Sequence, residues 1–86
     1  MTEPVELPIE DSIDLHTFQP GEIADLVKEY LHQALLRGYR EVRIIHGRGI
    51  GVQRRIVHSL LEKHSQVVTF NDGADRGSTV VTLKQQ

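Results

Sequence analysis

The sequence EVRIIHGRGIG at residues 41–51 decides the fold of this chain. It begins with a run of β-branched residues, which is typical of a strand over 41–45. Gly47, Gly49 and Gly51 follow at every second position, and glycine lets the backbone turn tightly. The stretch therefore predicts a buried strand that runs directly into a glycine turn.

A helix is expected immediately after this turn, because apolar residues recur with helical spacing from Val52 onward. The N-terminus of a helix has unpaired N–H donors and an electrostatic field that favours anions. His46 and Arg48 lie within the same turn. This combination suits a phosphate group better than a neutral ligand.

The remaining elements follow from the same periodicities. The last two strands are separated by a loop of turn-forming residues over 71–77, so we expect them to form a hairpin. Strands that are separated by helices pair in parallel through right-handed crossovers. We predict an α/β (α+β) sandwich, β-α-β-α-β-β, with a four-stranded mixed sheet and two helices: strands at 12–16, 41–45, 66–70 and 78–83, and helices at 22–37 (opened by Pro20) and 52–64.

The composition is that of one small globular domain. The chain has 86 residues, of which 38% are apolar and 26% charged, and no run approaches the roughly 20 apolar residues of a membrane span. It has no cysteine, which excludes disulfides and fits a cytoplasmic protein. We expect residues 1–11 to be a flexible acidic leader, residues 12–86 to be the domain, and the protein to be a monomer without membrane contact.

The net charge of −2 conceals an uneven distribution. Residues 1–14 contain five acidic and no basic side chains, whereas residues 37–55 contain six arginines and one glutamate, a local charge of 6 − 1 = +5. A local basic field can hold a polyanion even on a slightly acidic domain. Ordinary solvated surface is the alternative, but the coincidence with the glycine turn favours an anionic partner, with Arg54 and Arg55 as phosphate-binding residues.

Four polar residues are candidates for phosphodiester chemistry: Asp14, His16, His46 and Arg48. The two histidines each end a strand of the predicted sheet, and if these two strands are neighbours, both histidines lie at one edge. Histidine transfers protons near neutral pH, a carboxylate can orient an imidazole, and arginine with turn amides can stabilise charge on a phosphoryl oxygen. The alternative for each histidine alone is a structural, hydrogen-bonded role.

Two other kinds of site were considered. His16 and His46 with Asp14 would make a two-histidine, one-carboxylate metal triad, although their spacing does not require one. The glycine turn lacks the Lys-Ser/Thr of a phosphate-binding Walker loop, and its G-x-G-x-G spacing differs from the dinucleotide-binding G-x-G-x-x-G. The remaining histidines lie on helices without partners at informative spacing, and we expect them at the surface: His32, His58 and His64.

Two motifs resemble those of Smr (small MutS-related) domains. Ile13-Asp14-Leu15-His16 is similar to the family's LDLH motif and His46-Gly47-Arg48-Gly49 to its HGxG motif, and the stretch from Gly77 resembles its closing glycine-led strand. The resemblance covers about residues 12–84 and indicates a stand-alone protein of this kind. It implies a fold similar to the C-terminal domain of translation initiation factor three, in agreement with the predicted element order.

The resemblance also implies a function. Members of the family bind nucleic acid, and several nick DNA or cleave RNA, often with a divalent cation such as Mg²⁺ or Mn²⁺. It implicates Asp14 and His16 in catalysis or metal binding, His46 in catalysis, and Gly47, Arg48 and Gly49 in phosphate binding. The glycine turn itself adds Gly51 to the predicted phosphate-binding residues. Here Thr17 replaces the glycine that many members have after the first motif, which changes the turn beside His16.

The sequence leaves three hypotheses. The first is a nicking endonuclease for DNA or structured RNA, the second is a nucleic-acid-binding module without cleavage, and the third is an adaptor whose basic surface meets an acidic protein.

Overall fold

A computed structural model describes residues 11–47, 51–74 and 77–84 of the chain. The described elements follow the predicted order β-α-β-α-β-β. They are β1 (Ser12–Asp14), α1 (Pro20–Leu36), β2 (Glu41–Ile45), α2 (Val52–Lys63), β3 (Val67–Asp72) and β4 (Ser78–Leu83). The leader that was expected over residues 1–11 lies outside the described residues except for Asp11.

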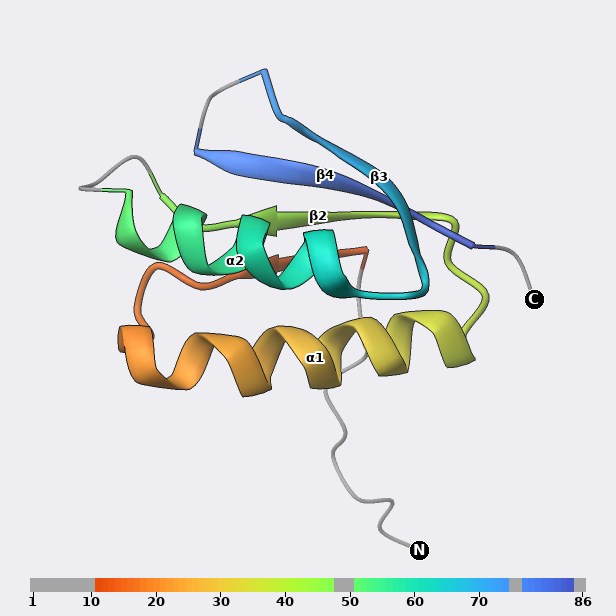
Figure 1. The fold of residues 1–86 in the computed structure, drawn as a ribbon, viewed down its shortest axis with the longest axis horizontal. Helices are drawn as coiled ribbons and strands as arrows, with labels where there is room; N and C mark the ends of the chain where they lie inside the picture. Colours follow the sequence, from red (N-terminus) through yellow and green to blue (C-terminus); the bar gives the residue numbers. More distant parts are fainter. Residues whose placement is uncertain (1–10, 48–50, 75–76, 85–86) are drawn as a thin grey trace, which may run out of the picture.

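The sheet has the strand order β1-β2-β4-β3 (Figure 1). β1 and β2 are parallel, whereas β4 runs antiparallel to both of its neighbours. Asp14 is in register with Ile45, and the N–H of Leu15 donates to the Ile45 carbonyl at 2.7 Å. The carboxyl ends of β1 and β2 therefore meet at one edge of the sheet, as the sequence predicts.

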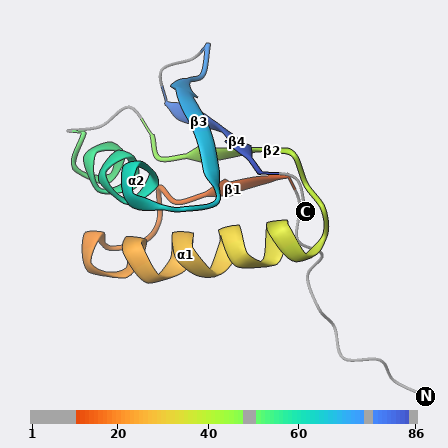
Figure 2. The same cartoon turned by 45° about the vertical axis from the view of Figure 1, so that its right-hand side comes forward.

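Both helices cover the same face of the sheet, so the domain has two layers (Figures 1 and 2). Side chains alternate between faces along a strand, and Val42 and Ile44 of β2 accordingly point toward the helices together with Val81 of β4. The core between the layers consists of twelve buried residues: Leu15, Ile23, Val27, Tyr30, Leu31, Ala34, Val42, Ile44, Val57, Leu61, Val81 and Leu83.

The helix ends show how the sequence sets the element boundaries. α1 begins with a capping box between Gln19 and Glu22 and has Pro20 in its first turn. α2 begins after Gly51, whose φ of 78° lies in the left-handed region that favours glycine. As the N-cap residue of α2, Gly51 makes no side-chain hydrogen bond to the first turn.

Several predicted boundaries differ from the structure by one or two residues, and two of these differences have a local cause. β1 ends at Asp14 rather than at residue 16, because the chain turns as the Phe18 N–H donates to the Leu15 carbonyl at 3.0 Å. The prediction that the loop begins at residue 71 is wrong. Asn71 and Asp72 continue β3, because their backbones pair with β4 despite their turn-forming side chains. Neither helix among the described residues combines the length and apolar character that crossing a membrane requires.

The central strand provides a test of the core. Ile44 is fully buried in β2, so we expect Ile44→Ala to lower the free energy of unfolding by about 2–5 kcal/mol through lost burial and an internal cavity. Leu36→Ala is the control, because Leu36 is 68% exposed at the end of α1 and should change stability by less than about 0.5 kcal/mol. Urea unfolding measures the free energy of unfolding of both variants. Equal losses of stability in the two variants would contradict this assignment of the core.

Candidate catalytic and phosphate-binding site

Asp14 and His16 form a hydrogen-bonded pair at the carboxyl end of β1. The ring Nδ1 of His16 lies 2.5 Å from Oδ1 of Asp14, and the main-chain N–H of His16 donates to the same oxygen at 3.0 Å. The two side chains are 63% and 48% exposed, respectively. The sequence therefore predicted this pairing correctly, and the pair is open to a large substrate.

The pair has a defined protonation pattern. The hydrogen bond from the His16 backbone, followed by the bond from its ring, holds the pKa of the Asp14 carboxyl below its ordinary value. Asp14 is consequently an ionised acceptor at neutral pH, and a neutral His16 carries its hydrogen on Nδ1. The other ring nitrogen, Nε2, then has a free lone pair that can accept a proton.

Gly47 lies directly beside His16. A Cβ at position 47 would be 3.7 Å from the His16 Cβ, and the Gly47 φ of 85° is in the left-handed region. The N–H groups of Gly47 and His46 both donate to the Gly77 carbonyl, at 2.9 and 3.0 Å. The Gly47 amide therefore ties the turn to the start of β4, and a role of Gly47 in phosphate binding stays a prediction. Arg48 and Gly49 lie outside the described residues.

His46 reaches the same sheet edge but points to the other side. Side chains alternate along β2, so His46 follows Val42 and Ile44 onto the helix-covered face, whereas Asp14 is in register with Ile45. The His46 side chain is only 4% exposed. Its Nε2 lies 2.9 Å from Oγ1 of Thr79, and its Nδ1 lies 3.1 Å from the Gly47 carbonyl oxygen. The structure thus joins Asp14 with His16, but not with His46.

A second polar cluster surrounds His58, for which the expectation of a surface position is wrong. His58 is half-buried, its Nε2 lies 2.9 Å from Oγ1 of Thr79, and its ring packs edge-on against Phe70. Burial, and next the Arg54 charge, lower the pKa of His58. In the sequence, His58 directly follows Val57, which the helical period places in the core. Nothing in the sequence, however, indicates that Thr79 of β4 lies opposite His58.

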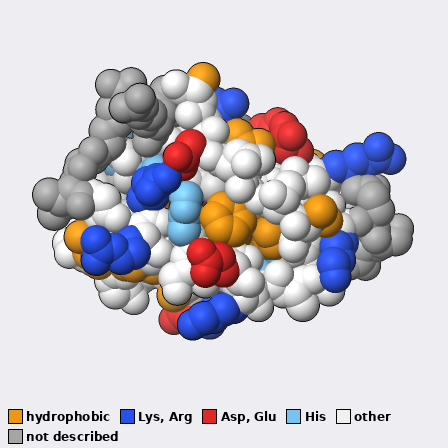
Figure 3. All heavy atoms as spheres, turned by 45° about the horizontal axis from the view of Figure 1, so that its top comes forward, with side chains coloured by type: hydrophobic (Ala, Val, Ile, Leu, Met, Phe, Trp, Pro, Cys, Tyr) orange, Lys and Arg blue, Asp and Glu red, His pale blue; other side chains and the backbone are white. Residues whose placement is uncertain are grey.

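Arg54 belongs to this cluster as well. Its guanidinium donates to both carboxylate oxygens of Asp72, at 2.7 and 2.8 Å, and this bond lowers the pKa of Asp72. The predicted phosphate contact through Arg54 therefore competes with an ion pair inside the domain. Figure 3 shows the same mixture on a larger scale, since basic, acidic and histidine side chains are interspersed on the face in view.

The first turn of α2 lies next to the Asp14–His16 edge. The side-chain amide of Gln53 donates to the Phe18 carbonyl at 2.7 Å, which ties α2 to the turn that follows His16. The start of α2 is thus linked to the turn that follows the exposed histidine. The N-terminus of a helix suits a phosphate oxygen.

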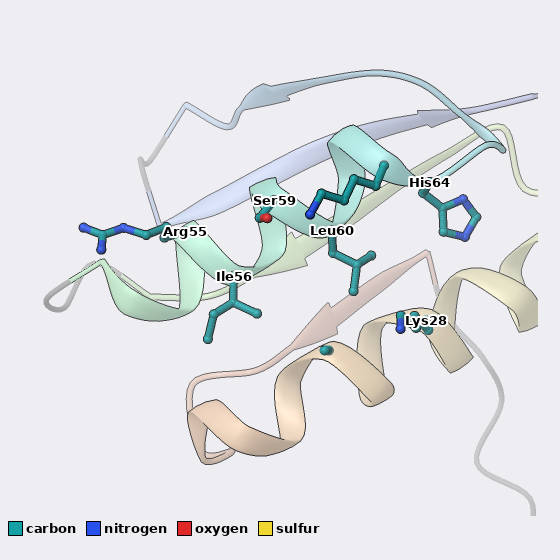
Figure 4. A pocket seen from close by; sticks show the side chains of 8 residues that line it. Lys28, Arg55, Ile56, Ser59, Leu60 and His64 are labelled. Carbon is teal, nitrogen blue, oxygen red and sulfur yellow. The ribbon is translucent and has the colours of Figure 1, made fainter.

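A groove of about 760 Å³ lies between α1 and α2 (Figure 4). Ile56 and Leu60 contribute apolar side chains to it, and Lys28, Arg55 and Lys63 contribute positive charge. No carboxylate of the described residues lines the groove. Asp14, His16 and His46 are also not among its lining residues, so Arg55 belongs to a surface separate from the candidate catalytic pair.

The described residues do not form a metal cage. No three His, Cys, Asp or Glu side chains among residues 11–47, 51–74 and 77–84 are placed to hold a metal ion. The two-histidine, one-carboxylate triad is excluded for a simple reason, since His46 points away from Asp14 and His16. In addition, Oδ1 of Asp14 already accepts two hydrogen bonds.

Comparison with known proteins agrees with these motifs and their geometry. Residues 13–84 match the Smr domain. The chain belongs to the Smr domain family. The prediction made from the two sequence motifs is thus confirmed.

Solved Smr structures have the same fold. The Smr domain of Thermus thermophilus MutS2 superposes with a TM-score of 0.81 at 28% identity, covering 85% of this chain and 96% of that chain. YdaL, a stand-alone small MutS-related protein from Escherichia coli, superposes with a TM-score of 0.83 at 26% identity, covering 87% of this chain and 65% of that chain. The predicted mixed sheet with two helices is confirmed by this Smr architecture.

The curated relatives are much longer proteins. Endonuclease MutS2 of Solidesulfovibrio magneticus is 40% identical over 76 residues, which is 84% of this chain and 10% of the relative. Endonuclease MutS2 of Clostridium botulinum is 39% identical over 80 residues, with 88% of this chain covered. This Smr chain therefore spans about a tenth of the length of the relatives it matches.

The histidines of the Smr domain predict a pH dependence of stability. Burial lowers the pKa of both His58 and His64 from 6.5, so the unfolded chain takes up protons at a pH where the folded chain resists them. Stability should therefore fall as the pH is lowered from about 7.5 to about 5.5. In a double variant, His58→Gln with His64→Gln, the fall should be smaller.

Urea unfolding at both pH values measures the effect. His32→Gln is the control, because His32 is exposed on α1, and it should retain the fall. An undiminished fall in the double variant would contradict the assigned cause.

Proposed function

We propose that this Smr domain binds nucleic acid and cleaves phosphodiester bonds, with Asp14 and His16 as the catalytic pair. The observation that carries the proposal is the exposed, hydrogen-bonded Asp14–His16 pair, followed by a turn that Gln53 ties to the start of α2. The relatives named Endonuclease MutS2 support a nuclease of this general kind.

The pair suits general-base catalysis. Asp14 accepts the Nδ1 hydrogen of His16, which orients the ring and leaves Nε2 as the nitrogen that accepts a proton. Nε2 takes a proton from water or a ribose hydroxyl as that oxygen bonds to phosphorus. The bond to the leaving oxygen then breaks, and this oxygen takes its proton from solvent. The ionised Asp14 stabilises the imidazolium that His16 becomes.

The scissile phosphate would sit between His16 and the first turn of α2. Gly51, the N-cap residue, makes no side-chain hydrogen bond to this turn, and the dipole at a helix N-terminus favours a negative charge. Gln53 holds this turn next to the residues that follow His16. Arg48 remains a predicted phosphate contact from the sequence. His46 supports the site from behind through its hydrogen bond with the Gly47 carbonyl.

Substitution of the pair tests the proposal. We expect His16→Ala to lower the rate of cleavage by about 10²–10⁴-fold, the usual contribution of a positioned proton acceptor. Asp14→Asn should also reduce the rate, because it removes the charge that stabilises the imidazolium. Affinity should change little in both variants. The assay uses supercoiled plasmid and a structured RNA with Mg²⁺, with Mn²⁺ and with EDTA, and binding is measured on the same samples.

His32→Ala is the matched control, since His32 is an exposed histidine on α1 away from the sheet edge. It should cleave as the wild type does. Wild-type cleavage that survives His16→Ala would refute the catalytic pair. Binding without cleavage by the wild type would leave a recognition module that keeps the pair as a phosphate contact.

The groove between the helices supports a second candidate, an adaptor that binds an acidic protein segment. Its apolar side chains and its three positive charges would suit a segment that carries both apolar and acidic residues. This surface is independent of Asp14 and His16, so the two functions are separable by substitution.

Arginine substitutions distinguish these partners. If nucleic acid contacts Arg54 and Arg55, then Arg54→Ala with Arg55→Ala should weaken binding for all sequences and lower the slope of log K against log salt by about 0.7–0.9 per lost phosphate contact. Arg37→Ala, at the end of α1, is the control. Unchanged affinity and slope in the double variant would mean that nucleic acid binds elsewhere. Arg55 would then remain only as a residue that lines the groove between α1 and α2.

A further inference from the structure

The hydroxyl of Thr79 joins two histidines in the interior of the domain. Its Oγ1 lies 2.9 Å from Nε2 of His46 and 2.9 Å from Nε2 of His58. Thr79 is fully buried. A threonine hydroxyl has one hydrogen to donate and two lone pairs. It can therefore donate to one of the two rings and must accept from the other.

The Gly47 carbonyl determines the direction of this chain of hydrogen bonds. A carbonyl only accepts, so the His46 Nδ1 at 3.1 Å must carry a hydrogen. In a neutral His46, Nε2 then has no hydrogen and accepts from the Thr79 hydroxyl. The Thr79 oxygen in turn accepts from the Nε2–H of His58. The order of donation is His58 to Thr79 to His46.

The chain reverses when His46 becomes charged. Its Nε2–H then donates to Thr79, the Thr79 hydroxyl donates to Nε2 of His58, and His58 carries its hydrogen on Nδ1. The protons balance as follows: Nδ1 of His58 takes one proton from solvent, Nε2 of His58 passes one to Thr79, and Thr79 passes its own to Nε2 of His46. No other bond changes.

His58 is the more accessible end of the chain. Its side chain is 22% exposed, whereas His46 is 4% exposed, and it borders a hollow of about 400 Å³. The charged groups that act on it are Arg54 and Glu62 of α2 and Asp72 of β3, with an Asp72 oxygen 3.7 Å from its Nε2. The two imidazole centroids are 6.3 Å apart, so a charge on one ring opposes a charge on the other.

We propose that His58 and Thr79 form a proton relay to the buried His46, with His58 as the residue that exchanges protons with solvent. Both are positioning residues that act through His46. A charge on His46 lies behind the Gly47 turn, where it favours an anion at the candidate phosphate site. Only this last consequence rests on the proposed function, because the relay itself is a property of the protein alone.

Nuclear magnetic resonance of the imidazole ¹⁵N nuclei of the full chain tests the relay. At a pH where both rings are neutral, we expect His46 to carry its hydrogen on Nδ1 and His58 to carry its hydrogen on Nε2. As the pH falls, both rings should respond at one shared midpoint, because they share the first proton. His46 in the Nε2–H form, or two unrelated midpoints, would overturn the relay.

Two substitutions of Thr79 separate its hydroxyl from its shape. Thr79→Val keeps the shape and removes the hydroxyl, so the hydrogen-bonded link between the two rings is lost and they should no longer respond at a shared midpoint. Thr79→Ser keeps the hydroxyl and should retain the shared midpoint. A shared midpoint in Thr79→Val as clear as that of the wild type would refute the role of the hydroxyl.

The pH profile of cleavage gives the functional readout. The profile should change in Thr79→Val, which breaks the link between the two rings, and stay unchanged in Thr79→Ser. A wild-type chain that cleaves nothing would refute the proposed nuclease, whereas the imidazole titrations would still decide the relay.

Discussion

The parallel pairing of β1 with β2 is the constraint on which the rest of the site depends. Asp14 and Ile45 are in register, and the Leu15 N–H bonds to the Ile45 carbonyl. This pairing brings two motifs that are about thirty residues apart in sequence to one edge. The helix α1 between them serves as the crossover and at the same time supplies much of the core. The same hydrogen bonds therefore stabilise the fold and bring the catalytic pair next to the glycine turn.

The alternation of side chains along the strands then divides the motif residues between two environments. Asp14 and His16 are exposed, and no hydrogen bond among the described residues involves Nε2 of His16, whereas His46 is enclosed and has both ring nitrogens hydrogen-bonded. The histidines of the two motifs therefore have different roles. The exposed histidine can meet a substrate, and the buried histidine fixes the backbone that lies next to it. Burial, rather than residue type, decides between these roles.

The sequence predicted the elements well where periodicity and caps agree. β2 and β4 have the predicted bounds, and α1 and α2 differ from them by one or two residues at an end. It failed where tertiary pairing overrides local preference: Asn71 and Asp72 are turn formers, yet they pair with β4. The Asp14–His16 pair was predictable because its partners are two residues apart. The Thr79 bridge was not, because it joins β2, α2 and β4, whose relative rotation no local pattern encodes.

The irregular pairing of β3 has a consequence for how the molecule behaves in concentrated solution. β3 is an outer strand of the sheet, and Val68 on it is 60% exposed. A regular outer strand with exposed apolar residues offers its free backbone groups to the strand of another molecule. Here the register shifts between Val67 and Thr69, which interrupts the spacing that an incoming strand would have to match. A single irregularity in the backbone thus disfavours edge-to-edge aggregation.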